Sequence, residues 1–130
     1  MKRLALTVIL LLSASKAPAQ DLVELPGGES LKIFGVSEVN ATDRTAWMLR
    51  YETLLNLDVD RERVLREVIG LWHSYARERV ELNELDYFVI CANTPQEGTR
   101  SEMLCHFFQL MEERWHLRVG GSDWLELDSE

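Results

Sequence analysis

The residues best suited to chemistry in this chain are its two cysteines, Cys91 and Cys105. The segment between them contains Pro95 and Gly98, which are turn residues. An even number of cysteines is typical of a disulfide in an exported protein, and the C-x-x-C spacing of redox-active pairs is absent. We therefore expect a structural disulfide between Cys91 and Cys105, with no role in catalysis.

The remaining candidates for acid–base or metal chemistry are three histidines: His73, His106 and His116. None lies in an H-x-H, H-x-x-x-H or H-E-x-x-H arrangement, so we expect no metal site. His106 and His116 alternate out of phase with Cys105 and Trp115, which predicts that both share the second face of a sheet with Arg118. Such a cluster can bind an anion or act as a base. The alternative is an ordinary amphipathic outer face.

No motif indicates a nucleophile or a nucleotide cofactor. The serines stand in no G-x-S-x-G context, and the chain contains neither a P-loop nor a G-x-G-x-x-G sequence. Tyr51 and Thr53 are candidates for lining a pocket beneath a helix, and the alternative for Tyr51 is a core tyrosine with a satisfied hydroxyl. We therefore expect no cofactor and assign no catalytic residue.

The N-terminus has the three-part pattern of a secretory signal peptide. Lys2 and Arg3 precede an apolar run at residues 4–12, and the sequence Ala17-Pro18-Ala19 forms an A-x-A cleavage pattern. The apolar run is shorter than the roughly 20 residues that cross a bilayer, which disfavours the alternative of a retained anchor. We expect residues 1–19 to be removed and the protein to be periplasmic or secreted from a bacterium, with no later membrane association.

The charge balance excludes nucleic acid as a partner. The chain has 14 basic and 22 acidic residues and a net charge of −8. Removing Lys2, Arg3 and Lys16 leaves 11 basic against 22 acidic side chains, a mature net charge of about −11. A surface of this sign repels phosphate backbones and anionic headgroups. The expected partner is a protein or a small molecule, unidentified from the sequence.

Hydrophobic periodicity predicts one α+β domain at residues 31–119. Residues 20–30 contain Pro26-Gly27-Gly28 and are expected to form a flexible leader, and residues 120–130 an acidic tail. Strands are predicted at 31–39, with a possible bulge at Gly35, and at 45–55 and 87–92. Residues 60–80 form an amphipathic helix with Asp58 or Asp60 as its N-cap.

The segment 101–111 fits either a helix or a strand, and alternation at 115–119 favours a hairpin. A β-hairpin centred on Gly98 pairs residues whose numbers sum to 196, which brings Cys91 opposite Cys105. Their Cα atoms should then be about 4.4–6.8 Å apart. The resulting fold is a mostly antiparallel sheet of order β-β-α-β-β-β, with the long helix packed on one face.

Three short stretches give this sequence a resemblance to a loose group of small exported bacterial proteins of unknown function. They are R-Y-E-T-L at residues 50–54, E-V-x-x-x-W at 67–72, and A-N-x-P at 92–95. The resemblance implies export and a β-α-β core, and no activity.

We therefore expect a small exported protein with a non-catalytic binding or accessory role. One alternative is a small enzyme or ligand carrier with a pocket between helix and sheet, using Tyr51 and one sheet histidine. Another is an effector- or immunity-type protein that binds a partner through the histidine-bearing face.

Overall fold

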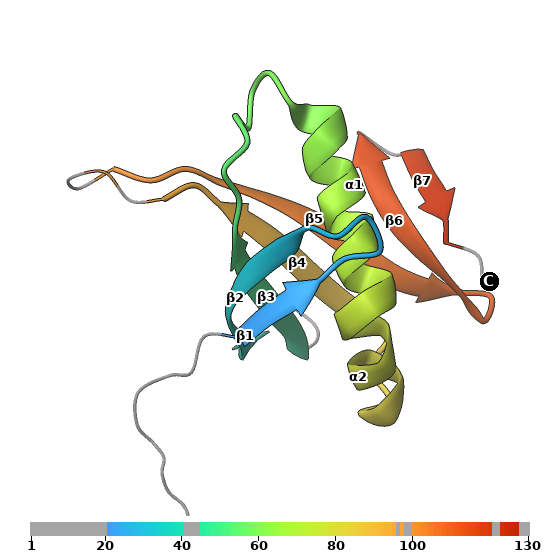
Figure 1. The fold of residues 1–130 in the computed structure, drawn as a ribbon. Coiled ribbons are helices and arrows are strands. Elements are labelled where there is room, and N and C mark those ends of the chain that lie inside the picture. Colours follow the sequence, from blue (N-terminus) through green and yellow to red (C-terminus); the bar gives the residue numbers. More distant parts are fainter. Residues whose placement is uncertain (1–20, 41–44, 96, 98–99, 121–122, 128–130) are drawn as a thin grey trace, which may run out of the picture.

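One seven-stranded sheet organises the computed structural model, which describes residues 21–40, 45–95, 97, 100–120 and 123–127 (Figure 1). Neighbouring strands follow chain order, and all pairs are antiparallel except β3 and β4, which are parallel. The strands are β1 (Asp21–Glu24), β2 (Ser30–Asn40), β3 (Thr45–Glu52), β4 (Tyr87–Asn93), β5 (Met103–Met111), β6 (Arg114–Gly120) and β7 (Asp123–Glu126).

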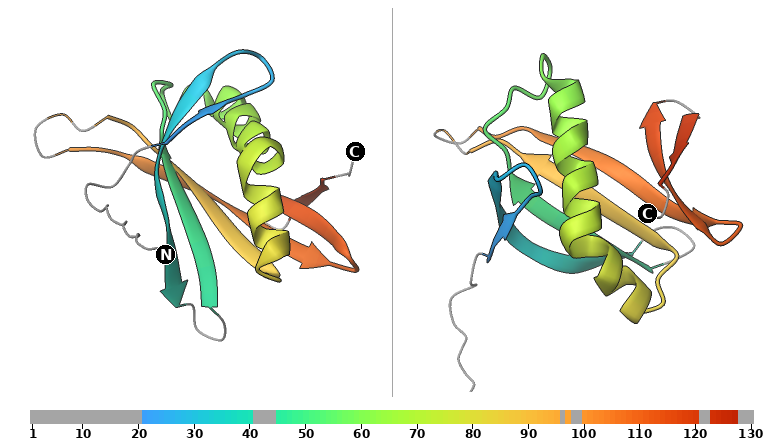
Figure 2. Two further views of the ribbon diagram at one scale, coloured as in Figure 1. Left: turned by 60° about the horizontal axis from the view of Figure 1, so that its bottom comes forward. Right: turned by 45° about the vertical axis from the view of Figure 1, so that its right-hand side comes forward.

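The crossover between the two parallel strands contains the helix. It consists of α1 (Arg61–Leu71), a π-helical turn η2 (Trp72–Ala76) and α2 (Arg77–Leu82). The helix runs across one face of the sheet, and the outer strands curl toward it on both sides (Figures 1 and 2). It begins directly after Asp60, as expected. The Asp60 carboxylate, however, accepts a hydrogen bond from the Asn56 N–H rather than capping the first turn.

The α+β class and the mostly antiparallel sheet agree with the sequence-based expectation, but the predicted order of elements was wrong. The expected leader contains β1, which pairs with β2, and the expected tail contains β7, which pairs with β6. Both segments bury an apolar side chain just after their strand: Leu25 is 7% exposed and Leu127 is 9% exposed. The predicted signal peptide lies outside the described residues.

Left-handed backbone conformations mark the turns. Gly28, with φ of 95°, closes the β1–β2 turn, so the Pro-Gly-Gly sequence connects two strands. Gly35 coincides with a register shift between β2 and β3, which confirms the expected bulge. The β5–β6 turn is made by Glu112 and Glu113, with φ of 54° and 67°. Residues with a Cβ rarely adopt this conformation.

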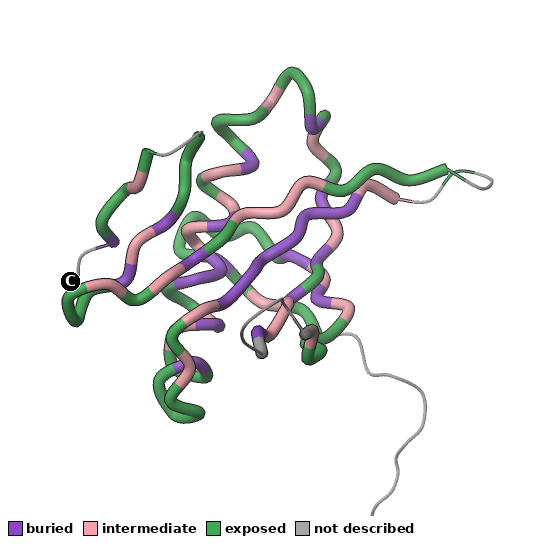
Figure 3. The backbone as a smooth tube through the Cα atoms, turned by 180° about the vertical axis from the view of Figure 1, so that it is seen from behind, coloured by how far each residue is buried: buried purple, intermediate pink, exposed green. Residues whose placement is uncertain are grey.

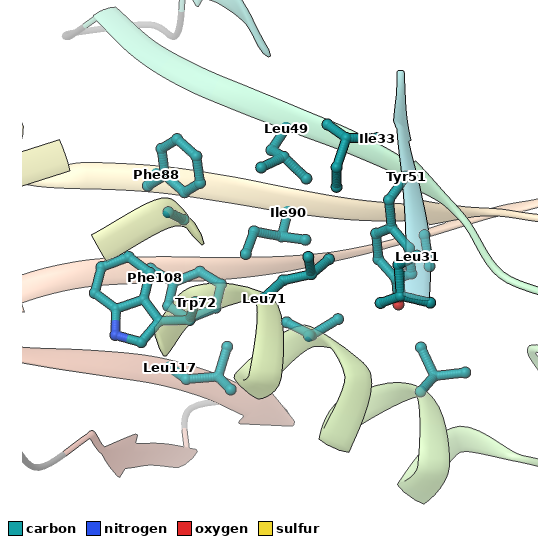
Figure 4. Packing of buried hydrophobic residues seen from close by; sticks show 14 of the residues in the cluster. Leu31, Ile33, Leu49, Tyr51, Leu71, Trp72, Phe88, Ile90, Phe108 and Leu117 are labelled. Atoms are coloured by element: carbon teal, nitrogen blue, oxygen red, sulfur yellow. The ribbon is translucent and has the colours of Figure 1, made fainter. Parts of the chain in front are cut away.

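The core lies between the helix and the covered face of the sheet. Trp72 is 1% exposed and stacks on Phe108, with ring centroids 4.7 Å apart and planes 13° apart. Trp115 and Phe88 contact the same indole at 4.9 and 6.4 Å. These rings, together with aliphatic residues of β2, β3 and β4, form one cluster with the helix (Figure 4).

Strand β4 is the centre of the sheet and is buried along most of its length (Figure 3). Its apolar run predicted such a strand, and its hairpin with β5 confirms the strand interpretation of residues 101–111. Cys91 pairs with Cys105 in the predicted register and the two are disulfide-bonded. Their Cα atoms are 4.0 Å apart, slightly closer than expected. The disulfide lies on the face of the sheet that the helix leaves uncovered.

Candidate functional site

A half-buried carboxylate, Glu67, joins the helix to strand β3. The Tyr51 hydroxyl donates a hydrogen bond to Glu67 Oε1 at 3.0 Å, and the Thr53 hydroxyl donates to the same oxygen at 2.8 Å. Tyr51 and Thr53 are 0% and 1% exposed. They point toward the helix because residues 51 and 53 lie two apart on an extended chain and so share one face. Glu67 meets them from the flank of α1, beside the buried stripe of Val64, Val68 and Leu71.

Burial governs the protonation of this cluster. It raises the pKa of the Glu67 carboxyl. The hydrogen bonds from Thr53 and Tyr51 and the charge of Arg63 lower this pKa and so offset part of the rise. The charge of Glu29 raises the pKa of Glu67 further. The Tyr51 pKa is also raised, first by burial and then by the Glu67 charge and hydrogen bond. Tyr51 therefore remains a protonated donor at physiological pH.

Glu67 borders a hollow of about 540 Å³ between α1 and the β1–β2 turn. We call it the Glu67 hollow. The apolar side chains that line it include Leu25, Leu55 and Ile69. The charged side chains that line it, besides Glu67, are Glu29, Arg63 and Arg66. A second hollow, of about 360 Å³, shares Glu29, Leu55 and Glu67 with the first. Both volumes lie within the range of small-molecule sites.

Gly70 sets the distance between the helix and the β1–β2 turn. A Cβ added at Gly70 would lie 3.2 Å from Leu25 Cδ1, closer than ordinary van der Waals contact. The absence of a side chain therefore lets Leu25 lie directly against α1, where both residues line the Glu67 hollow. A larger residue would push Leu25 away or narrow the hollow.

Tyr51 is the predicted site residue that this cluster contains. Its ring is fully buried in the core, and it reaches the hollow only through its hydrogen bond to Glu67. Sequence analysis selected Thr53 with Tyr51 for a pocket beneath the helix, but it did not select Glu67. The alternation of the strand placed Thr53 on the same side as Tyr51, whereas Glu67 appeared only in the E-V-x-x-x-W stretch of the resemblance. Nothing in the sequence showed that the two elements would meet at these residues.

The predicted cluster of His106, His116 and Arg118 does not form. His116 and Arg118 share a face of β6, but the expectation that His106 lies on that face was wrong. His106 is paired with Ile90 and faces the helix, whereas His116 is paired with Gln109 and faces away from it. The two-residue turn pairs Met111 with Arg114, so even-numbered residues of β5 share a face with odd-numbered residues of β6.

Each member of that predicted cluster has its own surroundings. His106 Nδ1 is buried without a hydrogen-bond partner, and burial, then the charge of Arg61, lowers the His106 pKa. The ring Nδ1 of His116 lies 3.0 Å from the Arg114 carbonyl oxygen. Arg118 lies over the Trp124 ring, 5.9 Å from its centroid.

The face opposite the helix combines apolar and polar side chains around the disulfide. Met103 and Phe107 are 54% and 36% exposed there. The Arg50 guanidinium lies over the Phe34 ring and donates from Nε to Asn93 Oδ1 at 3.4 Å. No helix of the described residues covers this face (Figure 2).

The three stretches that carry the resemblance meet in the structure. Tyr51 and Thr53 of the first bond to Glu67 of the second, and the Thr53 N–H donates to the Asn93 carbonyl of the third at 2.8 Å. The Glu67 cluster is therefore the point at which these segments, distant in sequence, are joined.

A larger hollow of about 760 Å³ lies at the other end of the helix, beside Trp72 and Trp115. Its acidic side chains are exposed to solvent, unlike Glu67. Within the described ranges, no group of three or more histidine, cysteine, aspartate or glutamate side chains could hold a metal ion. Among the described residues, no helix combines the length and the apolar character needed to cross a membrane.

Comparison with known proteins yields no match to a family model, a curated protein or a solved structure. Function is therefore inferred from the geometry of the Glu67 cluster alone.

Proposed function

We propose that the protein is an exported, non-catalytic binding protein that holds a small amphipathic molecule in the Glu67 hollow. One observation carries this proposal: a half-buried carboxylate with two hydrogen bonds at one oxygen borders a hollow with apolar walls. Ligand sites of this size combine apolar walls with a few placed polar groups. Tyr51 and Thr53 hold the carboxylate in position.

The hydrogen bonds and burial of the Tyr51 and Thr53 hydroxyls favour a binding role over catalysis. The Thr53 hydroxyl donates to Glu67 and accepts from the Leu55 N–H at 3.1 Å. The Tyr51 hydroxyl is held protonated by burial and by Glu67. Neither is poised as a nucleophile, because both side chains are buried and neither lines the hollows beside Glu67.

Export is supported by the signal-peptide pattern of residues 1–19 and by the Cys91–Cys105 disulfide, which persists in oxidising compartments. Cleavage after Ala19 would give a mature protein that begins at Gln20. Intact-mass measurement of protein from a bacterial envelope fraction tests this, and a species retaining Met1 would contradict it.

The binding proposal is tested by two-dimensional amide NMR of the mature protein. The probes are small apolar molecules that carry an amine, an alcohol, an amide or a carboxylate. We expect at least one head group to produce saturable shifts concentrated at Leu55, Glu67 and Gly70. The Gly70→Ala variant, with a narrower hollow, should bind that probe more weakly. Saturable shifts confined to the uncovered sheet face, or none with any head group, would contradict the proposal.

A further inference from the structure

The two oxygens of Glu67 have different surroundings. Both hydroxyl donors, Tyr51 and Thr53, reach Oε1. No described residue donates a hydrogen bond to Oε2, and this oxygen is not among the buried unpaired atoms. Glu67 lines both neighbouring hollows. Oε2 is thus a hydrogen-bond acceptor left available at the hollows.

A second carboxylate stands at the same place. Glu29, at the end of the β1–β2 turn, lines both hollows together with Glu67. The Glu29 charge disfavours ionisation of Glu67, which shows that the two groups repel each other. A positive charge between them would relieve this repulsion and pair with the available oxygen.

The arginines of the Glu67 hollow do not supply that charge by direct contact. Arg63 lies 4.0 Å from the Asp60 carboxylate, with 58% of its side chain exposed. Neither Arg63 nor Arg66 forms an ion pair or hydrogen bond with Glu29 or Glu67 within the part of the chain described. The charge of Arg63 acts on Glu67 without direct contact, so solvent weakens its effect.

The walls determine what else the ligand must carry. Leu25, Leu55 and Ile69 line the Glu67 hollow, and Gly70 allows Leu25 to lie against the helix. Resting on the function proposed above, we infer that the ligand is a small molecule with an ammonium group on an apolar body. The ammonium binds Glu67 Oε2 near Glu29, and the apolar body packs against these three side chains.

Three probes with the same apolar side chain and different charge test this inference: leucine amide, N-acetylleucine amide and N-acetylleucine. At pH 7 most of the leucine amide is protonated at its α-amino group, because the ordinary pKa of that group is about 7.7–8.0. Acetylation removes the positive charge but leaves the apolar side chain. We expect leucine amide to shift the amide signals of Leu55, Glu67 and Gly70, and both acetylated probes to bind at least about tenfold more weakly.

Matched variants separate charge from shape. Glu67→Gln retains an oxygen that Tyr51 and Thr53 can reach but removes the charge, so affinity for leucine amide should fall about tenfold. Glu78→Gln removes a charge from an exposed position of α2 that borders none of these hollows, and should leave affinity unchanged. Amide spectra of both variants report whether the fold is retained.

The outcomes distinguish this inference from the function on which it rests. Equal binding of the amine and its acetylated form, or an unchanged affinity in Glu67→Gln, would overturn the ammonium inference and leave the hollow as a binding site. The same holds if leucine amide fails while an alcohol or carboxylate probe binds. Failure of every head group would overturn the proposed function itself.

Discussion

Trp72 should be the side chain on which the attachment of the helix to the sheet depends most. It is 1% exposed and contacts three aromatic rings: Phe88, Phe108 and Trp115. Replacing a buried tryptophan by alanine costs about 3–5 kcal/mol, and an aromatic pair adds about 0.5–1.5 kcal/mol beyond area burial. We therefore expect Trp72→Ala to cost about 5 kcal/mol, which is comparable with the whole stability of a small domain.

The matched control is the next residue. His73 is exposed, so His73→Ala should change the free energy of unfolding by no more than about 0.5 kcal/mol. If Trp72→Ala does not fold, Trp72→Phe keeps one ring and should cost about 1–3 kcal/mol. Urea unfolding followed by far-UV circular dichroism measures these differences without relying on the tryptophan signal. Similar losses for the Trp72 and His73 variants would refute the packing described above.

Three further changes should alter stability in defined directions. Replacing both Cys91 and Cys105 by alanine should cost about 3 kcal/mol in urea unfolding, because the disulfide closes a loop of about 15 residues; an unchanged midpoint would count against it. Replacing Glu112 by Asn and Glu113 by Gly should raise the melting temperature by the equivalent of about 1 kcal/mol, because Asn and Gly suit left-handed turns; a lower melting temperature would contradict this. His106 has a lowered pKa, so the unfolded state binds more protons and stability falls as pH drops from about 6.5 through that lowered pKa. His106→Leu should remove this loss of stability between pH 7 and 5. An identical profile of unfolding free energy against pH in the parent protein and the variant would contradict the prediction.

The central part of the fold followed from periodicity. The apolar run of β4 and the alternation at 115–119 predicted the strands, and the cysteine register followed from one loop centre. The outer strands were missed for a physical reason. They are four residues long, and Pro26-Gly27-Gly28 suggests a loop until a partner strand is known.

The candidate site was less predictable than the fold. The histidine error came from assuming that Cys105 and Trp115 share a face, which the two-residue turn at Glu112 and Glu113 reverses. Tyr51 was selected together with Thr53, but without the carboxylate to which both donate. Its role depends on Glu67, sixteen residues further along the chain, and only the packing of α1 on β3 brings the two residues together.

The most direct test of this account is a pH titration of the Glu67 side-chain carboxyl carbon by NMR, with and without leucine amide. Without ligand, the midpoint should lie above the ordinary value of 4.5, because burial disfavours the charged form. An ammonium bound at Oε2 favours the carboxylate, so leucine amide should lower this midpoint while N-acetylleucine amide leaves it unchanged. A midpoint at the ordinary value that neither compound moves would contradict the account.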